Sequence, residues 1–154
     1  MAELKERLRV DLPEAMKSRD KLRTATLRML LAAIQTEEVS GKQARELTDE
    51  DVLKVLAREA KKRGEAAEIY TQNGRGELAA EEHAEARIID EYLPTPLTDA
   101  EVADVVDTAI AAVAEEIGER PSVRQMGLVM KAATEIAAGK ADGSRLSAAV
   151  KDRL

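Results

Sequence analysis

Nearly all apolar side chains in this chain of 154 residues are aliphatic, because the sequence has no tryptophan, phenylalanine or cysteine and only two tyrosines. Alanine, leucine, valine, isoleucine and methionine supply the rest, and Ala, Leu, Glu, Lys and Arg dominate the whole chain. Most of these residues lose little side-chain freedom in a helix. Strand-like alternation with aromatic enrichment is absent. The composition therefore predicts an all-α fold.

The spacing of the apolar residues supports this prediction. Leu27, Leu30, Leu31 and Ile34 lie at positions i, i+3, i+4 and i+7, which places them on one face of a helix. Side chains that cap helix N-termini stand before most of the predicted helices. We expect four longer helices and three shorter ones, and a kink or restart near Val10 caused by Pro13. The predicted ranges are roughly 5–11, 20–39, 48–72, 77–92, 98–117, 122–136 and 144–153.

The clearest break in the chain is the segment 93–97, Leu-Pro-Thr-Pro-Leu, whose two prolines exclude helix around them. We therefore expect an N-terminal helical domain over 1–93, a proline-rich hinge over 94–97 and a three-helix C-terminal domain over 98–154. Thr98 and Glu101 form a predicted capping box for the first helix of the second domain.

Several classes of site are excluded by residue type. Without cysteine there is no disulfide, thiolate nucleophile, zinc ribbon or iron–sulfur cluster. His83 is the only histidine and lies among glutamates, so a solvated side chain is favoured over a catalytic one. The segment 139–144, Gly-Lys-Ala-Asp-Gly-Ser, lacks the spacing of a phosphate-binding loop. We predict no catalytic residue, no metal and no cofactor.

Arg63 is unusual because it falls on the apolar stripe of its helix, seven residues after Leu56 and seven before Tyr70. An inward-facing arginine needs an acidic partner. Glu82 and Glu85, on the following antiparallel helix, are the expected partners. A structural ion pair between helices and a ligand-binding role both remain open.

The net charge of −6 is unevenly distributed. Residues 1–30 have a net charge of +3, residues 31–80 of −2, residues 81–119 of −11 and residues 120–154 of +4. The total argues against indiscriminate binding of polyanions, whereas the basic C-terminal segment fits contact with a phosphate backbone. Lysine and arginine that serve only solubility remain the alternative. No stretch approaches the about 18 apolar residues of a membrane span, and the charged N-terminal segment does not look like a signal peptide. We expect a cytoplasmic protein.

Four segments are similar to a known family. They are 11–34 (DLPEAMKSRDKLRTATLRMLLAAI), 47–76 (LTDEDVLKVLAREAKKRGEAAEIYTQNGRG), 88–101 (IIDEYLPTPLTDAE) and 126–154 (MGLVMKAATEIAAGKADGSRLSAAVKDRL). In this order the chain resembles the GatB/YqeY family over nearly its whole length, and most of all the stand-alone YqeY-type members. The resemblance implies an all-helical chain with a three-helix tail.

The other branch of this family is the tail domain of the GatB component of the tRNA-dependent amidotransferase, where the tail implies contact with the body of the tRNA. Carried over to this sequence, the resemblance implies phosphate contacts at Lys131 and Lys140, with Gly127 and Gly139 allowing close backbone approach. Arg124 and Arg145 are added on charge and proximity.

The chain also departs from the family. A motif that usually reads Arg-x-Glu-Ser is Arg63-Gly64-Glu65-Ala66 here, and the catalytic machinery of the amidotransferase is absent. We therefore expect a non-catalytic helical adaptor that binds tRNA or a tRNA-handling complex. The alternatives are a protein–protein interaction module that uses the acidic region 81–119 and, last, a carbon–nitrogen ligase with glutamine as amido donor in its own right.

Overall fold

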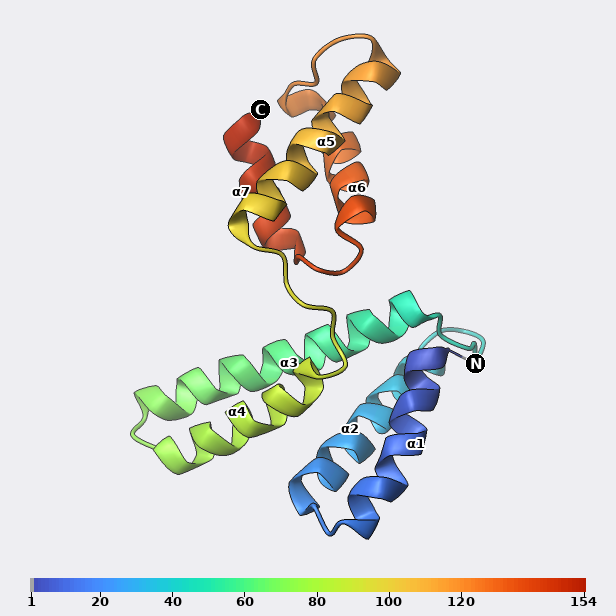
Figure 1. Ribbon diagram of the computed structural model, residues 1–154, viewed down its shortest axis with the longest axis vertical. Coiled ribbons are helices and arrows are strands. Elements are labelled where there is room, and N and C mark those ends of the chain that lie inside the picture. Colours follow the sequence, from blue (N-terminus) through green and yellow to red (C-terminus); the bar gives the residue numbers. More distant parts are fainter. Residues whose placement is uncertain (1) are drawn as a thin grey trace. The chain divides into compact units, whose positions relative to one another are not determined.

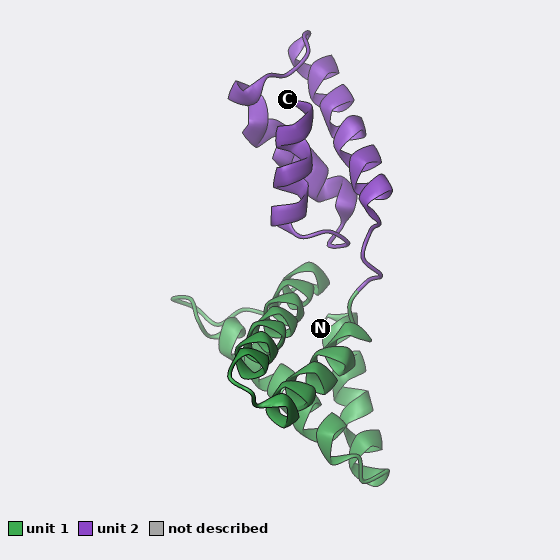
Figure 2. Cartoon of the chain, turned by 90° about the vertical axis from the view of Figure 1, so that its left-hand side faces the viewer, with its two compact units in different colours: residues 1–93 green, residues 94–154 purple. Residues whose placement is uncertain are grey.

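A computed structural model describes residues 2–154 (Figure 1). Within these residues the chain has seven α-helices, one short 3₁₀ helix and no strand, so the predicted all-α class is confirmed. The chain divides into two compact units, 1–93 and 94–154 (Figure 2). The helices are α1 (Glu3–Lys17), α2 (Lys21–Glu38), α3 (Asp49–Gln72), α4 (Gly76–Asp90), α5 (Asp99–Ile117), η1 (Val123–Gln125), α6 (Met126–Ala137) and α7 (Gly143–Arg153).

The first unit consists of two helical hairpins, α1–α2 and α3–α4 (Figure 1). The helices within each hairpin lie side by side, and α2 contacts both helices of the second hairpin. The core between the hairpins is built from large aliphatic side chains, which is the burial that their helical spacing predicts. The fully buried large residues include Leu8, Leu27, Leu30, Ile34, Leu56 and Ile89.

The capping side chains that the sequence predicts lie at the starts of α2, α3 and α5. Asp20 accepts a hydrogen bond from the Arg23 amide and caps α2. Thr48 forms a capping box with Asp51 at the start of α3, and Thr98 forms one with Glu101 at the start of α5. Each box satisfies two backbone N–H groups that have no partner inside the helix. The hydrogen bonds from Thr48 and Thr98 lower the pKa values of Asp51 and Glu101.

The expected restart of the first helix near Val10 is wrong. The helix α1 runs without a break through Pro13, which lies inside it. Leu8 and Ala15, before and after the proline, are both buried on the same core face. Because Pro13 lies on the exposed side, the carbonyl left without a donor can turn towards water, and the burial of both flanking turns outweighs the local loss.

The second unit is a bundle of α5, α6 and α7 with a core of smaller side chains (Figure 2). Valine and alanine fill most of its buried positions, and Ile110 and Leu146 are the larger exceptions. Gly118 ends α5 in the left-handed conformation, with a φ of 80°, which glycine adopts without a steric penalty. Among residues 2–154, no helix has the length and apolar content needed to cross a membrane.

Candidate nucleic-acid interface

Three of the expected phosphate contacts follow the course of α6. Arg124 lies in η1 just before the helix, Lys131 lies in its middle and Lys140 lies in the loop after it, and all three are exposed. In the part of the chain that the structure describes, no carboxylate forms an ion pair with Arg124 or Lys131. Lys140 lies near Glu101 at the start of α5, since its charge contributes to the lowered pKa of that carboxyl. The charge of Lys140 is therefore partly balanced within the unit.

The two glycines of the expected interface differ in their surroundings. Gly127 lies on the exposed side of α6, one turn before Lys131, and a Cβ built there would meet no heavy atom within 4 Å. This position offers a smooth helix surface beside the lysine. Gly139 follows Ala138, and both have positive φ angles, of 81° and 50°. They end α6 and turn the backbone into the loop that contains Lys140.

A backbone hydrogen bond joins the loop after α6 to the segment just before α5. The Leu97 amide donates to the Lys140 carbonyl at 2.8 Å, and Arg145 Nη1 donates to the Leu97 carbonyl at 2.8 Å. Arg145 Nη2 also donates to Asp99 Oδ1 at 2.9 Å. Arg145 is therefore engaged inside the second unit, where it joins the start of α7 to the start of α5. Of the expected contacts, it is the one whose charge is most fully neutralised.

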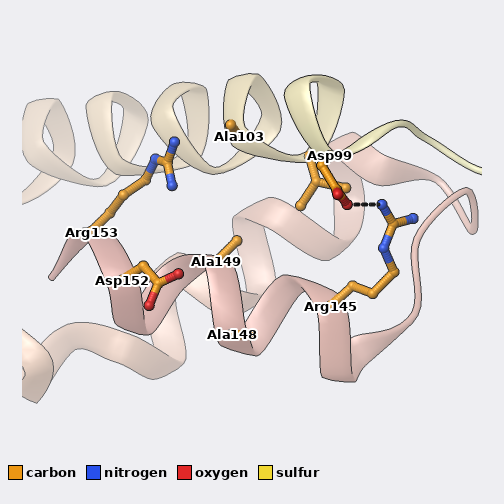
Figure 3. A pocket seen from close by; sticks show the side chains of 8 residues that line it. Asp99, Ala103, Arg145, Ala148, Ala149, Asp152 and Arg153 are labelled. Atoms are coloured by element: carbon orange, nitrogen blue, oxygen red, sulfur yellow. Dashed lines mark hydrogen bonds and ion pairs between the residues drawn. The ribbon is translucent and has the colours of Figure 1, made fainter.

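Arg145 lies at one end of a groove between α5 and α7 (Figure 3). Ala103, Ala148 and Ala149 line the groove, and Arg153 lies at its other end. Arg153 Nε forms an ion pair with Asp107 of α5 at 2.7 Å. Both arginines of the groove thus pair with α5, which makes the groove a packing feature of the bundle rather than an open anion site.

In the first unit, Arg63 lies at the centre of a charged network between α3 and α4. Its Nε contacts Glu85 Oε2 at 3.3 Å, and its Nη1 contacts Glu59 Oε2 at 2.6 Å. Lys62 Nζ also contacts Glu59, at 3.3 Å. Glu82, the other expected partner on α4, does not contact Arg63. Its place is taken by Glu59, which lies on α3 one turn before Arg63.

Glu59 is the member of this network that sequence reasoning missed. It is only 7% exposed, and its position four residues before Arg63 is the spacing of a helical ion pair. That spacing is one sequence signal for the pair. A second is that Glu59 lies three residues after the buried Leu56, on the same stripe, which indicates that its side chain points inward.

A second polar cluster joins α1 to the segment after α4. The Tyr92 hydroxyl donates to Asp11 Oδ2 at 2.5 Å, and the guanidinium of Arg7 lies 4.5 Å from the centre of the Tyr92 ring. Burial of Tyr92 and its hydrogen bond to Asp11 raise the pKa of the phenol to about 12. The tyrosine remains protonated at neutral pH and acts here as a hydrogen-bond donor.

Among residues 2–154, no group of three or more His, Asp or Glu side chains is arranged to hold a metal ion. His83 is exposed on α4. The fold and these sites define a class of small all-α proteins in which two helical hairpins are followed by a three-helix bundle.

Comparison with known proteins narrows this class. The family model for the Yqey-like protein matches residues 5–154, and the chain belongs to this family. It is 32% identical over 124 residues to altered inheritance of mitochondria protein 41, mitochondrial, of Meyerozyma guilliermondii, a match that covers 79% of this chain and 64% of that protein. It is also 36% identical over 87 residues to an uncharacterized protein of Schizosaccharomyces pombe, covering 56% of this chain and 69% of that one.

A third relative is altered inheritance of mitochondria protein 41, mitochondrial, of Clavispora lusitaniae, which is 33% identical over 86 residues. That match covers 56% of this chain and 49% of the relative. The chain thus spans between about half and two thirds of these fungal proteins.

Proposed function

We propose that this chain is a non-catalytic adaptor that binds tRNA, or a complex that handles tRNA, through the exposed cations along α6. The observation that supports the proposal is the row of Arg124, Lys131 and Lys140, which lies on one helix and its two flanking segments. The proposal includes a cytoplasmic location, where tRNA is abundant.

The shape of α6 suits this role. Arg124 and Lys131 are seven residues apart, or roughly 10 Å along a helix, so they can reach different phosphates of one backbone. Gly127 lies between them with open space beside it, which lets a nucleic-acid strand approach the helix closely. Contacts of this kind position a nucleic acid without reading its sequence.

The acidic remainder of the chain limits the strength of this contact. Six carboxylates and no basic residue lie on α5, so a polyanion would be repelled from that helix. Binding through three phosphates should weaken by about 20- to 40-fold between roughly 50 and 200 mM salt. We therefore propose a weak contact that is sensitive to salt.

The test is a fluorescence titration of labelled bulk tRNA with the full chain over a series of salt concentrations. The substitution Lys131→Gln should reduce the slope of log affinity against log salt by about 1, and Arg124→Gln with Lys131→Gln should reduce it by about 2.

The matched control is Lys151→Gln, because Lys151 is an exposed lysine of the same unit that lies on α7. It should leave the slope unchanged. Absence of binding at low salt, or equal losses from Lys131→Gln and Lys151→Gln, would rule out the α6 contact.

The second candidate function is a protein–protein module that uses the acidic surface of α5. Asp99 and Asp107 pair with arginines of α7, whereas Asp104, Glu115 and Glu116 are exposed and form no ion pair within residues 2–154. A pull-down with the full chain after nuclease treatment distinguishes the two functions. A protein recovered in stoichiometric amount, and lost on Asp104→Asn with Glu115→Gln and Glu116→Gln, would favour the module.

A further inference from the structure

A concentration of positive charge lies on the α1–α2 hairpin, and the α6 contact does not use it. Residues 15–36 contain five basic side chains and one acidic side chain. This segment has the same net charge of +4 as the whole of residues 120–154, within a shorter stretch. Its basic residues are Lys17, Arg19, Lys21, Arg23 and Arg28.

The outward face of α2 is basic and free of acidic residues. Lys21, Ala25, Arg28 and Ala32 lie within about 60° of one another around the helix, and all four are exposed. Only small side chains stand between the two cations, so a broad, flat surface can approach both at once.

The two acidic residues of α2 do not reach this face. Glu37 accepts from Arg58 of α3 at 3.3 Å, and Glu38 accepts from Lys5 of α1 at 2.9 Å. Both carboxylates are used within the first unit, at the opposite end of the helix from Lys21.

Arg19 adds a third cation at the tip of the hairpin. Its φ angle is 58°, the left-handed conformation that residues other than glycine rarely adopt. Asp20, the next residue, caps α2 and lies 3.8 Å from Arg23, which also pairs with Glu91 at 2.8 Å. Glu14 lies 3.7 Å from Lys17. Within residues 2–154, no carboxylate forms an ion pair with Arg19, Lys21 or Arg28. Three exposed cations therefore remain available at the tip of the hairpin and on the outward face of α2.

The apolar side chains nearby are too few for stable insertion into a bilayer. Leu22 is 38% exposed, and Met16 is 49% exposed with the guanidinium of Arg28 lying 3.7 Å from its sulfur atom. The chain has no tryptophan or phenylalanine to anchor at a membrane interface. Two of the three cations are arginines, whose planar guanidinium groups match phosphate oxygens.

We propose that the tip of the α1–α2 hairpin and the outward face of α2 form a second contact for an RNA phosphate backbone, made by Arg19, Lys21 and Arg28. This contact does not rest on the α6 contact, because its residues belong to the other compact unit.

The experiment titrates labelled bulk tRNA with the full chain and compares three variants over a series of salt concentrations. The first variant is Arg19→Gly with Lys21→Gln and Arg28→Gln. Glycine accepts the φ angle of Arg19, so this variant keeps the hairpin turn. The second variant is Arg124→Gln with Lys131→Gln. The third, a charge-matched control, is Lys42→Gln with Lys54→Gln and Lys61→Gln, three exposed lysines of the first unit outside α1 and α2.

The first variant should reduce the salt slope by about 2 to 3, and the control should leave it unchanged. A loss in the first variant alone supports the hairpin contact and contradicts the α6 contact, and a loss in the second variant alone does the reverse. Equal losses in the first variant and the control would overturn the hairpin contact. Binding of the full chain to vesicles of equimolar phosphatidylserine and phosphatidylcholine, without binding to tRNA, would overturn it in favour of a membrane surface.

Discussion

Individual residues matter most in this fold where charge is withdrawn from water, and Glu59 is the clearest case. Its side chain is 9% exposed, and it lies between Arg63 at 2.6 Å and Lys62 at 3.3 Å. Removing one partner of a buried pair leaves the other charge without compensation, whereas replacing both with apolar residues is often close to neutral.

This asymmetry gives a prediction for α3. Arg63→Met should lower the free energy of unfolding by about 2 to 3 kcal/mol, because Glu59 then keeps only the more exposed Lys62. Glu59→Met with Arg63→Met should return to within about 1 kcal/mol of the parent chain. Urea denaturation followed by circular dichroism measures both, with Lys62→Met as the control for loss of a surface charge. A double variant as unstable as Arg63→Met would show that the network stabilises the fold through more than charge compensation.

The inward direction of Arg63 follows from its heptad spacing, but the choice of partner does not. Glu59, Glu82 and Glu85 all lie within reach of a long side chain in a helical hairpin, and only the packed geometry selects two of them. The same holds for Arg145, whose sequence neighbourhood indicates a basic loop while the structure has it bonded to Leu97 and Asp99. Sequence reasoning finds unusual charges, whereas their partners depend on distances of a few ångströms.

At the scale of the helices, two glycines make opposite contributions. Gly64 lies inside α3, and Gly118 lies at the end of α5 with a φ of 80°. A Cβ built at either position would meet no atom within 4 Å, so steric contact does not distinguish them. The difference lies in the backbone conformation alone.

Replacing glycine with alanine should therefore have opposite effects on stability at these two positions. Gly64→Ala should raise the free energy of unfolding by about 0.5 to 1 kcal/mol, because alanine loses less chain entropy in a helix. Gly118→Ala should lower it by about 1 kcal/mol, because alanine is strained in the left-handed conformation. Thermal or urea denaturation of each variant measures its change in the free energy of unfolding. If Gly118→Ala proved neutral, α5 would have to end in another conformation.

Helix ends were the most predictable part of the fold, because capping chemistry is local. Asp20, Thr48 and Thr98 cap the helices that follow them, as the sequence predicts. Pro13 was misjudged, since its effect depends on which side of α1 faces the core. That side is determined by packing against the other helices of the unit rather than by the residues next to the proline.

At the scale of the whole molecule, the two hydrophobic cores share no residue. The first contains several fully buried leucines and isoleucines, whereas the second is built mostly from valine and alanine. A unit of about 60 residues buries a smaller fraction of its surface than a larger domain does and is correspondingly marginal. The second unit, 94–154, therefore has both the smaller size and the smaller core side chains.

This difference predicts that the second unit opens first and by itself. Val106 is 0% exposed in its core, and Val106→Ala should destabilise that unit by about 2 kcal/mol. Hydrogen exchange followed by mass spectrometry should then show amides of α5, α6 and α7 exchanging about 30-fold faster, with α1 to α4 unchanged.

The reciprocal control is Leu30→Ala in the first core, which should accelerate exchange in α1 to α4. Equal acceleration throughout the chain by Val106→Ala would mean that the two cores unfold as one cooperative unit. Separate opening would leave the α1–α2 hairpin folded while α6 is lost, so the two proposed RNA contacts could then be separated by mild denaturant as well as by substitution.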